Sequence, residues 1–358
     1  MTYPTMTVKL QNIKYNLDVI ANKCKKYNID IWAVTKGMSC PIELAREICE
    51  VNIGAIADSR LSNLINLKNQ GINKELSLIR IPMLSELEQV VENIDYSLIS
   101  EIDTLNEISK ICESKRKSHK VLLMVDMGDL REGFWVDQVD EISSCVRNLS
   151  PAVEVSGIAV NYACASGVIP SKESLNKFVK FGEELENFFG YELKIYSGGA
   201  TTQSLVSLGS DFLPDKINNL RIGEGYLLGT DTGCSDPIIP WLKQDTMFIE
   251  AELVEIKVKP SKPVGIIGKD AFGNIPEFVD RGKRKRGILA LGKQDIEISG
   301  MTPLDEGVLV LAASSDHLIV DLENCRKILK VGDILKFNVN YPAMLRASTS
   351  SYVKKIYL

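Results

Sequence analysis

Residues 29–51 read IDIWAVTKGMSCPIELAREICEV and contain one strand-like run followed by one helix-like segment. The first part, residues 29–36, is rich in apolar and β-branched side chains, which is typical of a buried strand. In residues 41–51, apolar side chains recur three and four positions apart, which predicts an amphipathic helix. A strand followed by such a helix is the repeating unit of a parallel sheet with helical connections.

The same alternation continues through the first 225 residues. Seven more strand-like runs follow, each with a helix-like segment after it: residues 53–60, 75–82, 96–101, 120–128, 155–163, 194–200 (with its helix over 201–213) and 219–224. Alternating strands and helices imply a parallel sheet with right-handed crossovers, and eight units of this size are enough to close a barrel. We therefore predict a TIM-like (β/α)8 barrel over residues 1–228.

The pattern changes after the eighth unit. Helical periodicity disappears, and β-branched runs alternate with Pro and Gly turns, among them KVGD at residues 330–333, which predicts a hairpin turn. Residues 229–358 are therefore predicted to form an all-β domain. We interpret the basic run RGKRKR at residues 281–286 as a solvated loop between strands.

The composition narrows the class of protein. The 358 residues carry a net charge of −5 at pH 7, and this acidic balance argues against a nucleic-acid partner. Eight cysteines without CxxC spacing and only two histidines predict reduced thiols and no metal site. No apolar run is long enough to span a membrane and the first residues lack a signal-peptide core, so we expect a cytoplasmic protein without a membrane partner.

Chemically unusual residues fall at the carboxyl ends of the predicted strands, where barrel enzymes carry their active sites. Lys36 ends the first strand, Arg131 follows the fifth, Asn161 ends the sixth and Arg221 lies in the eighth. Residues 197–202, SGGATT, follow the seventh. Their glycines and hydroxyls suit a phosphate site, although a tight turn with a threonine N-cap is the alternative.

Lys36 is the residue that needs an explanation. A charged amine at the end of an apolar strand is costly unless it is paired, modified or solvated, and a solvated rim lysine is the commonest case. A rim lysine with a phosphate site across the barrel mouth is, however, what a pyridoxal phosphate enzyme needs. The amine forms a Schiff base with the aldehyde of the cofactor, while the phosphate anchors it.

Taken together, the motifs resemble the fold type III pyridoxal phosphate enzymes related to alanine racemase, most closely the branch that includes ornithine racemase. The resemblance spans nearly the whole chain and is carried by AVTKG with Lys36, VDMGDLREG with Arg131, the SGG loop, NLRIGEGYLLG with Arg221, ASSDHLIVD with Asp316 and NYPAMLRAS with Tyr341. It implies a pyridoxal 5'-phosphate-dependent racemase that interconverts L- and D-amino acids through a Cα carbanion. It also implies a head-to-tail homodimer.

The resemblance implies a role for each matching residue. Lys36 would hold the cofactor and act as one catalytic base, and Arg131 would bind the substrate carboxylate. Arg221 would face the pyridine nitrogen and disfavour its protonation, which suits proton exchange at Cα more than decarboxylation. Asn161 stands where alanine racemases place a histidine on the cofactor ring. The phosphate would be held by Ser197, Gly198, Gly199, Thr201, Thr202 and Tyr341.

The base on the opposite face stays open. The C-terminal tyrosine of alanine racemases is missing, and Lys293 stands at about that place, while Met124 replaces a lysine that becomes carbamylated in those enzymes. The candidates are Lys293, Ser315 and His317. A lysine works if burial lowers its pKa, whereas a serine needs activation. Lys293 has an equally good interpretation as a solvated turn residue.

Asp316 indicates the substrate class. In the related diamino-acid decarboxylases an aspartate of a Cys-Asp pair accepts the distal ammonium, and SSD here has the same form, with His317 beside it. This favours ornithine, or another basic amino acid such as lysine, over alanine, although a turn aspartate is the simpler interpretation. Two other functions remain: an ornithine or lysine decarboxylase, disfavoured by Arg221 and Ser315, and a non-catalytic pyridoxal phosphate homeostasis protein, disfavoured by the β domain.

Overall fold

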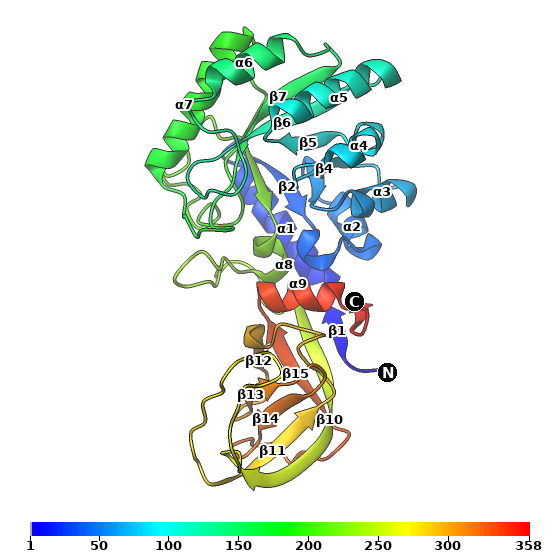
Figure 1. Ribbon diagram of the computed structural model, residues 1–358, viewed down its shortest axis with the longest axis vertical. Coiled ribbons are helices and arrows are strands. Elements are labelled where there is room, and N and C mark those ends of the chain that lie inside the picture. Colours follow the sequence, from blue (N-terminus) through cyan, green and yellow to red (C-terminus); the bar gives the residue numbers. More distant parts are fainter. Residues whose placement is uncertain (1) are drawn as a thin grey trace. The chain divides into compact units, whose positions relative to one another are not determined.

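The computed structural model describes residues 2–358 and forms two compact units (Figure 1). Residues 10–244 form one unit, and residues through Lys9 together with residues 245–358 form the other. This division differs from the expected boundary at residue 228. The reason is that strand β1 (Thr5–Val8) pairs with β10 (Met247–Pro260) and β16 (Lys354–Tyr357), so the N-terminal strand belongs to the C-terminal sheet.

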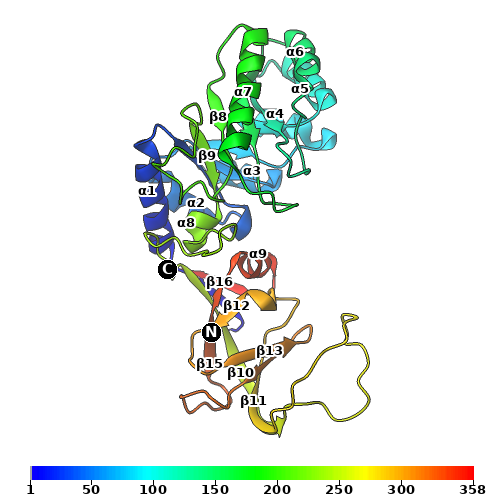
Figure 2. The same cartoon turned by 90° about the vertical axis from the view of Figure 1, so that its left-hand side faces the viewer.

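The first unit is the predicted (β/α)8 barrel. Its parallel strands close in chain order: β2 (Asp30–Val34), β3 (Ala55–Asp58), β4 (Glu75–Leu78), β5 (Tyr96–Ile99), β6 (His119–Val125), β7 (Val153–Val160), β8 (Ile195–Ser197) and β9 (Asn219–Ile222). The helices around them are α1 (Leu10–Lys25), α2 (Ile42–Cys49), α3 (Leu61–Asn69), α4 (Leu87–Asn93), α5 (Ile102–Lys115), α6 (Val139–Arg147), α7 (Lys172–Phe189) and α8 (Glu224–Leu228), with short 3-10 turns η1 (Lys36–Met38) and η2 (Leu84–Glu86) (Figure 2). All eight strand-like runs in the sequence are strands of this barrel.

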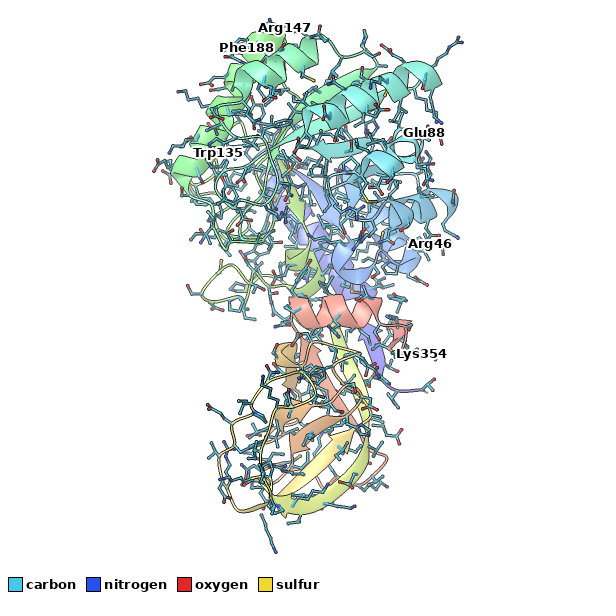
Figure 3. The ribbon with its side chains drawn as sticks, in the orientation of Figure 1. Arg46, Glu88, Trp135, Arg147, Phe188 and Lys354 are labelled. Carbon is cyan, nitrogen blue, oxygen red and sulfur yellow. The ribbon has the colours of Figure 1, made fainter. Side chains whose placement is uncertain are left out.

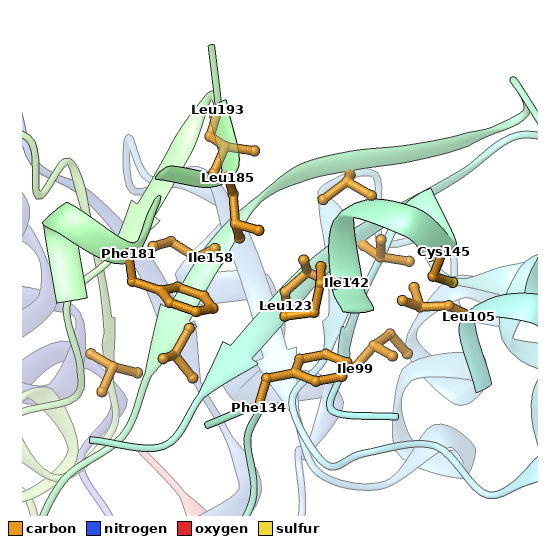
Figure 4. Close-up of a cluster of buried hydrophobic side chains, with 14 of the residues drawn as sticks. Ile99, Leu105, Leu123, Phe134, Ile142, Cys145, Ile158, Phe181, Leu185 and Leu193 are labelled. Carbon is orange, nitrogen blue, oxygen red and sulfur yellow. The ribbon is translucent and has the colours of Figure 1, made fainter. Parts of the chain in front are cut away.

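Successive residues of the barrel strands face two different cores. In β6, Leu122 and Met124 pack with Trp32 and Ala57 inside the barrel, whereas Leu123 points into the layer between strands and helices. That outer layer contains side chains from β5 to β8 and from α5 to α7, several of which Figure 4 shows. The near-continuous apolar runs of the sequence are explained by this burial on both faces.

Helices α6 and α7 illustrate how the outer helices are joined. The Arg147 guanidinium lies 6.0 Å from the centre of the Phe188 ring and its Nη2 donates to the Phe188 carbonyl at 3.4 Å (Figure 3). Both residues lie near the C-terminal ends of their helices. These contacts lie away from the carboxyl ends of the strands, because α6 leads into the amino end of β7.

The helix expected over residues 201–213 does not form. The segment is a series of turns in which Ser204 N donates to the Thr201 carbonyl at 3.1 Å and Ser207 N to the Gln203 carbonyl at 3.1 Å. Gln203 has a φ of +57°, and its amide donates to the Asp231 carboxylate at 2.7 Å instead of continuing a helix. Side-chain competition for backbone amides, in a segment rich in Ser, Thr and Gly, explains the error.

The second unit is antiparallel except where β1 meets β16. Its main sheet has the order β12-β15-β10-β11-β14-β13, with β1 paired to β10, and it contains helix α9 (Tyr341–Thr349) and 3-10 turn η3 (Ile298–Gly300). The remaining strands are β11 (Lys283–Leu289), β12 (Met301–Pro303), β13 (Leu309–Ala313), β14 (Leu318–Asp321) and β15 (Ile334–Val339). This confirms the all-β character predicted for the C-terminal part, to which the structure adds one helix.

Two local predictions in this unit were wrong. Most of the basic run at residues 281–286 lies in β11 rather than in a loop, and Arg284 pairs with the buried Asp321 at 2.9 Å. The KVGD segment is a turn, with Gly332 at a φ of +95°, but it joins no hairpin, because β14 before it and β15 after it do not pair with each other. Among the helices of residues 2–358, none is long and apolar enough to cross a membrane.

His119, the first residue of β6, should make stability depend on pH. It is buried, and its Nε2 lies 2.8 Å from Ser97 Oγ. Burial lowers the pKa of His119 to about 4. The unfolded chain binds this proton near pH 6.5 and the folded protein does not, so stability falls as the pH drops from 7 to 5. We expect the free energy of unfolding of His119→Gln, measured with urea at pH 7 and pH 5, to fall by about 2 kcal/mol less than that of the wild type. Equal falls in both proteins would contradict this assignment.

Candidate active site

Lys36 lies at the carboxyl end of β2, as the first residue of η1. Burial lowers the pKa of its amine, and the guanidinium groups of Arg131 and Arg221 lower it further, while Cys164 and Glu132 oppose them. The preceding Thr35 is fully buried and donates to Asp58 Oδ2 at 2.8 Å, which fixes the backbone on which Lys36 stands. The barrel therefore presents an amine that is less basic than an exposed lysine.

Arg131 lies in the loop after β6 and contacts the loop after β7. With its amide oxygen turned toward the guanidinium, Asn161 accepts hydrogen bonds from Arg131 Nη2 at 2.9 Å and Nη1 at 3.3 Å. Arg131 Nε and Nη2 also donate to the two carboxylate oxygens of Glu132. The structure thus brings two predicted residues, Arg131 and Asn161, together and adds Glu132, which the sequence analysis did not select.

A buried carboxylate joins the same two loops. Asp129 is 3% exposed, and its oxygens accept from the amides of Cys164 at 3.3 Å, Ala165 at 3.1 Å, Ser166 at 3.3 Å and Val168 at 3.4 Å. Its carbonyl also accepts from Ser166 Oγ at 2.7 Å. The sequence analysis missed Asp129, although it stands two positions before Arg131 in the VDMGDLREG motif. Its role is to hold the loop that carries Asn161 against the loop that carries Arg131.

Arg221 is buried in β9 and fixed by main-chain and side-chain acceptors. Its Nη2 donates to the Val160 carbonyl at 2.7 Å, and its Nη1 donates to Ser197 Oγ. Burial lowers the pKa of Arg221 to about 10, so the guanidinium is protonated at neutral pH. The Ser197 hydroxyl in turn donates to Asn219 Oδ1 at 2.5 Å. The Ser197 hydroxyl therefore links Arg221 to Asn219.

The SGG loop keeps its backbone close to β9. Gly198 N donates to the Asn219 carbonyl at 3.0 Å and Arg221 N to the Gly199 carbonyl at 2.9 Å. A Cβ at Gly198 would lie 2.6 Å from Ile217 Cγ2, and Gly199 has a φ of +128°. Thr201 is buried and its Oγ1 accepts from Gly225 N at 3.2 Å, while Thr202 is half-buried. Gly198 and Gly199 therefore form a close turn at the carboxyl ends of the strands. Residues with a Cβ would disfavour this turn.

Gly199→Ala should weaken cofactor binding because the backbone conformation is unfavourable for any other residue. The added Cβ would lie 3.7 Å from Tyr162 Cδ2, an ordinary contact, so the effect comes from φ alone. We expect the dissociation constant of the cofactor to rise by about 10- to 100-fold, measured by absorbance titration. Gly71→Ala is the matched control, since Gly71 has a φ of +78° with no atom near its Cβ and lies before β4. Equal cofactor affinity in both variants would contradict the role of this loop.

Four other predicted residues cluster in the C-terminal unit. Lys293 N donates to the Ser314 carbonyl at 2.9 Å, and Gln294 N donates to the Ser315 carbonyl at 3.0 Å, so the two turns lie side by side. His317 Nδ1 lies 2.9 Å from Asp316 Oδ1, and this contact is the main reason why the pKa of Asp316 is lowered. Ser315, Asp316 and His317 are exposed. Tyr341 lies apart from them in sequence, as the first residue of α9.

Lys293 also contacts an aromatic ring. Its Nζ lies 3.6 Å from the centre of the Phe272 ring, in the long segment between β10 and β11. A cation is attracted to a ring face, so this contact holds the Lys293 side chain in place. Within residues 2–358, no group of three or more His, Cys, Asp or Glu side chains is arranged to hold a metal ion.

The groups at the barrel mouth fit the requirements of pyridoxal phosphate. Lys36 supplies an amine whose pKa is lowered, as covalent linkage to an aldehyde requires. The Gly198–Gly199 turn allows the main chain to approach a phosphate, and Arg221 supplies a buried, fixed cation. The chemistry of this set therefore agrees with the cofactor that the sequence resemblance implies.

Comparison with known proteins identifies the family. A family model described as "Alanine racemase, N-terminal domain" matches residues 8–227. Lysine racemase of Thermotoga maritima is 38% identical over 358 residues, which cover 100% of this chain and 99% of that protein. Ornithine racemase of Acetoanaerobium sticklandii is 40% identical over 355 residues, or 99% of each chain.

Solved structures agree on the fold. Alanine racemase from D-cycloserine-producing Streptomyces lavendulae has a TM-score of 0.78 at 15% identity, covering 100% of this chain and 98% of that chain. Alanine racemase from Bartonella henselae, solved with covalently bound pyridoxal phosphate, has a TM-score of 0.74 at 16% identity, with 100% of both chains covered. From the family model and the two full-length relatives it follows that this chain belongs to the alanine racemase family of pyridoxal phosphate-dependent enzymes.

Proposed function

We propose that this pyridoxal phosphate-dependent amino-acid racemase interconverts the L- and D-forms of ornithine or lysine. The observation that carries the proposal is the similarity, over essentially the full length of each chain, to relatives named ornithine racemase and lysine racemase. The chemistry of the barrel mouth is compatible with it, since Arg131 can receive the carboxylate of an amino acid near the Lys36 amine.

The roles of the barrel residues follow from their surroundings. The cofactor, when bound, supplies an electron sink that makes the Cα proton of the substrate acidic. Lys36 would hold the cofactor and exchange this proton on one face of Cα, and its lowered pKa favours the neutral amine that a base requires. Arg131 would bind the α-carboxylate, and Asn161, which contacts its guanidinium, would orient it beside the cofactor ring. Arg221 would face the pyridine nitrogen.

The phosphate would be held by the loop after β8 together with Tyr341. Gly198, Gly199, Thr201 and Thr202 would supply amides and hydroxyls. Ser197 would contribute through its place at the start of the loop, since its hydroxyl is bonded to Asn219 and Arg221.

We assign the proton exchange on the opposite face to the C-terminal unit. Lys293 is the preferred group, because its Nζ is held over the Phe272 ring and its turn lies beside Ser314 and Ser315. Ser315 and His317 are the alternatives, and both lie in the adjacent turn. Asp316 would accept the side-chain ammonium of the substrate with His317 beside it, since an exposed carboxylate in the turn next to Lys293 can form a charge-assisted hydrogen bond with an amine.

Two further features belong to the same proposal. A head-to-tail homodimer would pair each barrel mouth with the C-terminal unit of the partner subunit. Mixing Lys36→Ala and Lys293→Ala proteins tests this arrangement, because a mixed dimer would regain one intact site, whereas sites within one subunit would stay inactive. A cytoplasmic location agrees with eight cysteines that are all free of disulfides.

Racemisation of L-ornithine and L-lysine in D2O with added pyridoxal phosphate tests the proposed function. We expect the circular dichroism signal of each to decay to zero and the amino acid to gain one deuterium at Cα without loss of mass. A product lighter by carbon dioxide would instead identify a decarboxylase. An unchanged amino acid in the presence of bound cofactor would identify a non-catalytic cofactor carrier.

A further inference from the structure

Glu132 occupies the part of Arg131 that a substrate carboxylate would use. Both carboxylate oxygens of Glu132 accept from Arg131, one from Nε and one from Nη2, which is the bidentate geometry that guanidinium groups form with carboxylates. The amide oxygen of Asn161 accepts from Nη1 and Nη2, on the other side of the guanidinium. Glu132 therefore stands in for a ligand carboxylate in the free protein.

This pair lies in the loop after β6, at the barrel mouth, where Glu132 is partly buried. The side chain of Glu132 is 19% exposed and that of Arg131 is 36% exposed. Glu132 also acts on the catalytic amine, since its negative charge raises the pKa of Lys36 against the effects of burial and of Arg131. A carboxylate so placed is costly to leave without a cation, because its exposure to water is small.

Substrate binding changes the charges around this pair. An amino-acid substrate would bring one carboxylate to Arg131 and displace Glu132 from it. If the substrate is alanine, no new cation arrives, and the carboxylates of Glu132 and of the substrate have only the Arg131 guanidinium between them. A basic amino acid brings its own side-chain ammonium, which replaces the cation that Glu132 has lost.

We propose that Glu132 contributes to specificity together with Asp316: it pairs with Arg131 in the free enzyme and turns to the side-chain ammonium of a basic amino acid when the substrate carboxylate takes Arg131. The inference rests on the proposed function, because it takes Arg131 as the carboxylate site. The exchange of partners favours diamino acids in two ways. Glu132 attracts the side-chain ammonium, and it competes for Arg131 with the carboxylate of any substrate that lacks such an ammonium.

Two inhibitors separate these effects. δ-Aminovalerate has the carboxylate and side-chain ammonium of ornithine but no α-amino group, and valerate lacks the ammonium as well. We expect the wild-type holoenzyme to bind δ-aminovalerate about 10- to 100-fold more tightly than valerate. In Glu132→Gln this ratio should fall at least about threefold, and Asp316 should supply the preference that remains, while valerate itself binds more tightly than to the wild type because its charged competitor is gone.

Control variants keep the inference falsifiable. Glu132→Asp retains the charge and should retain most of the preference, and Glu173→Gln, on the exposed start of α7, should retain all of it. An unchanged ratio of the two inhibitor affinities in Glu132→Gln would overturn the inference. An equal loss of affinity for both inhibitors would also overturn it, because this result means that Glu132 only positions Arg131. A separate result would contradict the proposed function itself: a wild-type enzyme that racemises alanine but neither ornithine nor lysine.

Discussion

Lys36→Ala is expected to abolish both racemisation and covalent attachment of the cofactor. The reason lies in the position of the amine: Lys36 lies in the first turn after β2, where burial lowers its pKa and the charges of Arg131 and Arg221 lower it further. Because Lys36 is proposed to be both the general base and the covalent anchor, its removal should reduce turnover by more than about 10⁴-fold, the range found for essential catalytic groups. Absorbance of the bound cofactor and borohydride reduction followed by mass analysis measure the attachment.

The control for this variant is a lysine outside the barrel mouth. Lys177 lies on the exposed face of α7, paired with Glu173 at 2.8 Å, and Lys177→Ala should keep both activity and covalent cofactor. Circular dichroism establishes that Lys36→Ala is folded. Cofactor that borohydride still fixes to the Lys36→Ala protein, or turnover at the wild-type rate, would show that another amine is the anchor.

The sequence was informative about the fold because both faces of the barrel strands are buried. In β6, the run His119–Val125 supplies Leu122 and Met124 to the interior and Leu123 to the outer layer, so the strand is recognisable from its apolar content alone. The segment after β8 was predicted wrongly for a physical reason. Its apolar spacing is helical, but the backbone amide of Gln203 donates to the carboxylate of Asp231. Asp231 lies 28 positions further along the chain, so no local pattern reveals this contact.

The same limit applies to the candidate site. Arg131, Asn161 and Arg221 were selected as candidates because they follow or lie in strands, and strand ends of a barrel converge. Asp129 and Glu132 lie in the same motif as Arg131 but were not selected, since acidic residues in a loop are usually solvated. Their importance depends on contacts between two loops, the Asp129 carboxylate with the amides near Cys164 and Glu132 with Arg131.

Arg131 variants should show the second-largest effect, and it should differ between alanine and lysine replacements. In its proposed role Arg131 makes two charge-assisted hydrogen bonds to the substrate carboxylate, and since Arg131→Ala loses both, kcat/KM for ornithine should fall by about 10³-fold. Arg131→Lys keeps the charge but loses the planar fork, and we expect a fall of about 10- to 100-fold. Both changes should appear mainly in KM if Arg131 binds the carboxylate equally in ground and transition states.

The split between KM and kcat decides what Arg131 does. Arg147→Ala is the matched control, because this arginine contacts the Phe188 ring near the end of α6 and should leave both constants unchanged. If Arg131→Ala lowers kcat alone, the guanidinium acts on the proton transfer and not on binding. If Arg131→Lys and Arg131→Ala lose activity equally, the fork geometry is essential, and Asn161, which fixes that fork at 2.9 Å, becomes part of the carboxylate site itself.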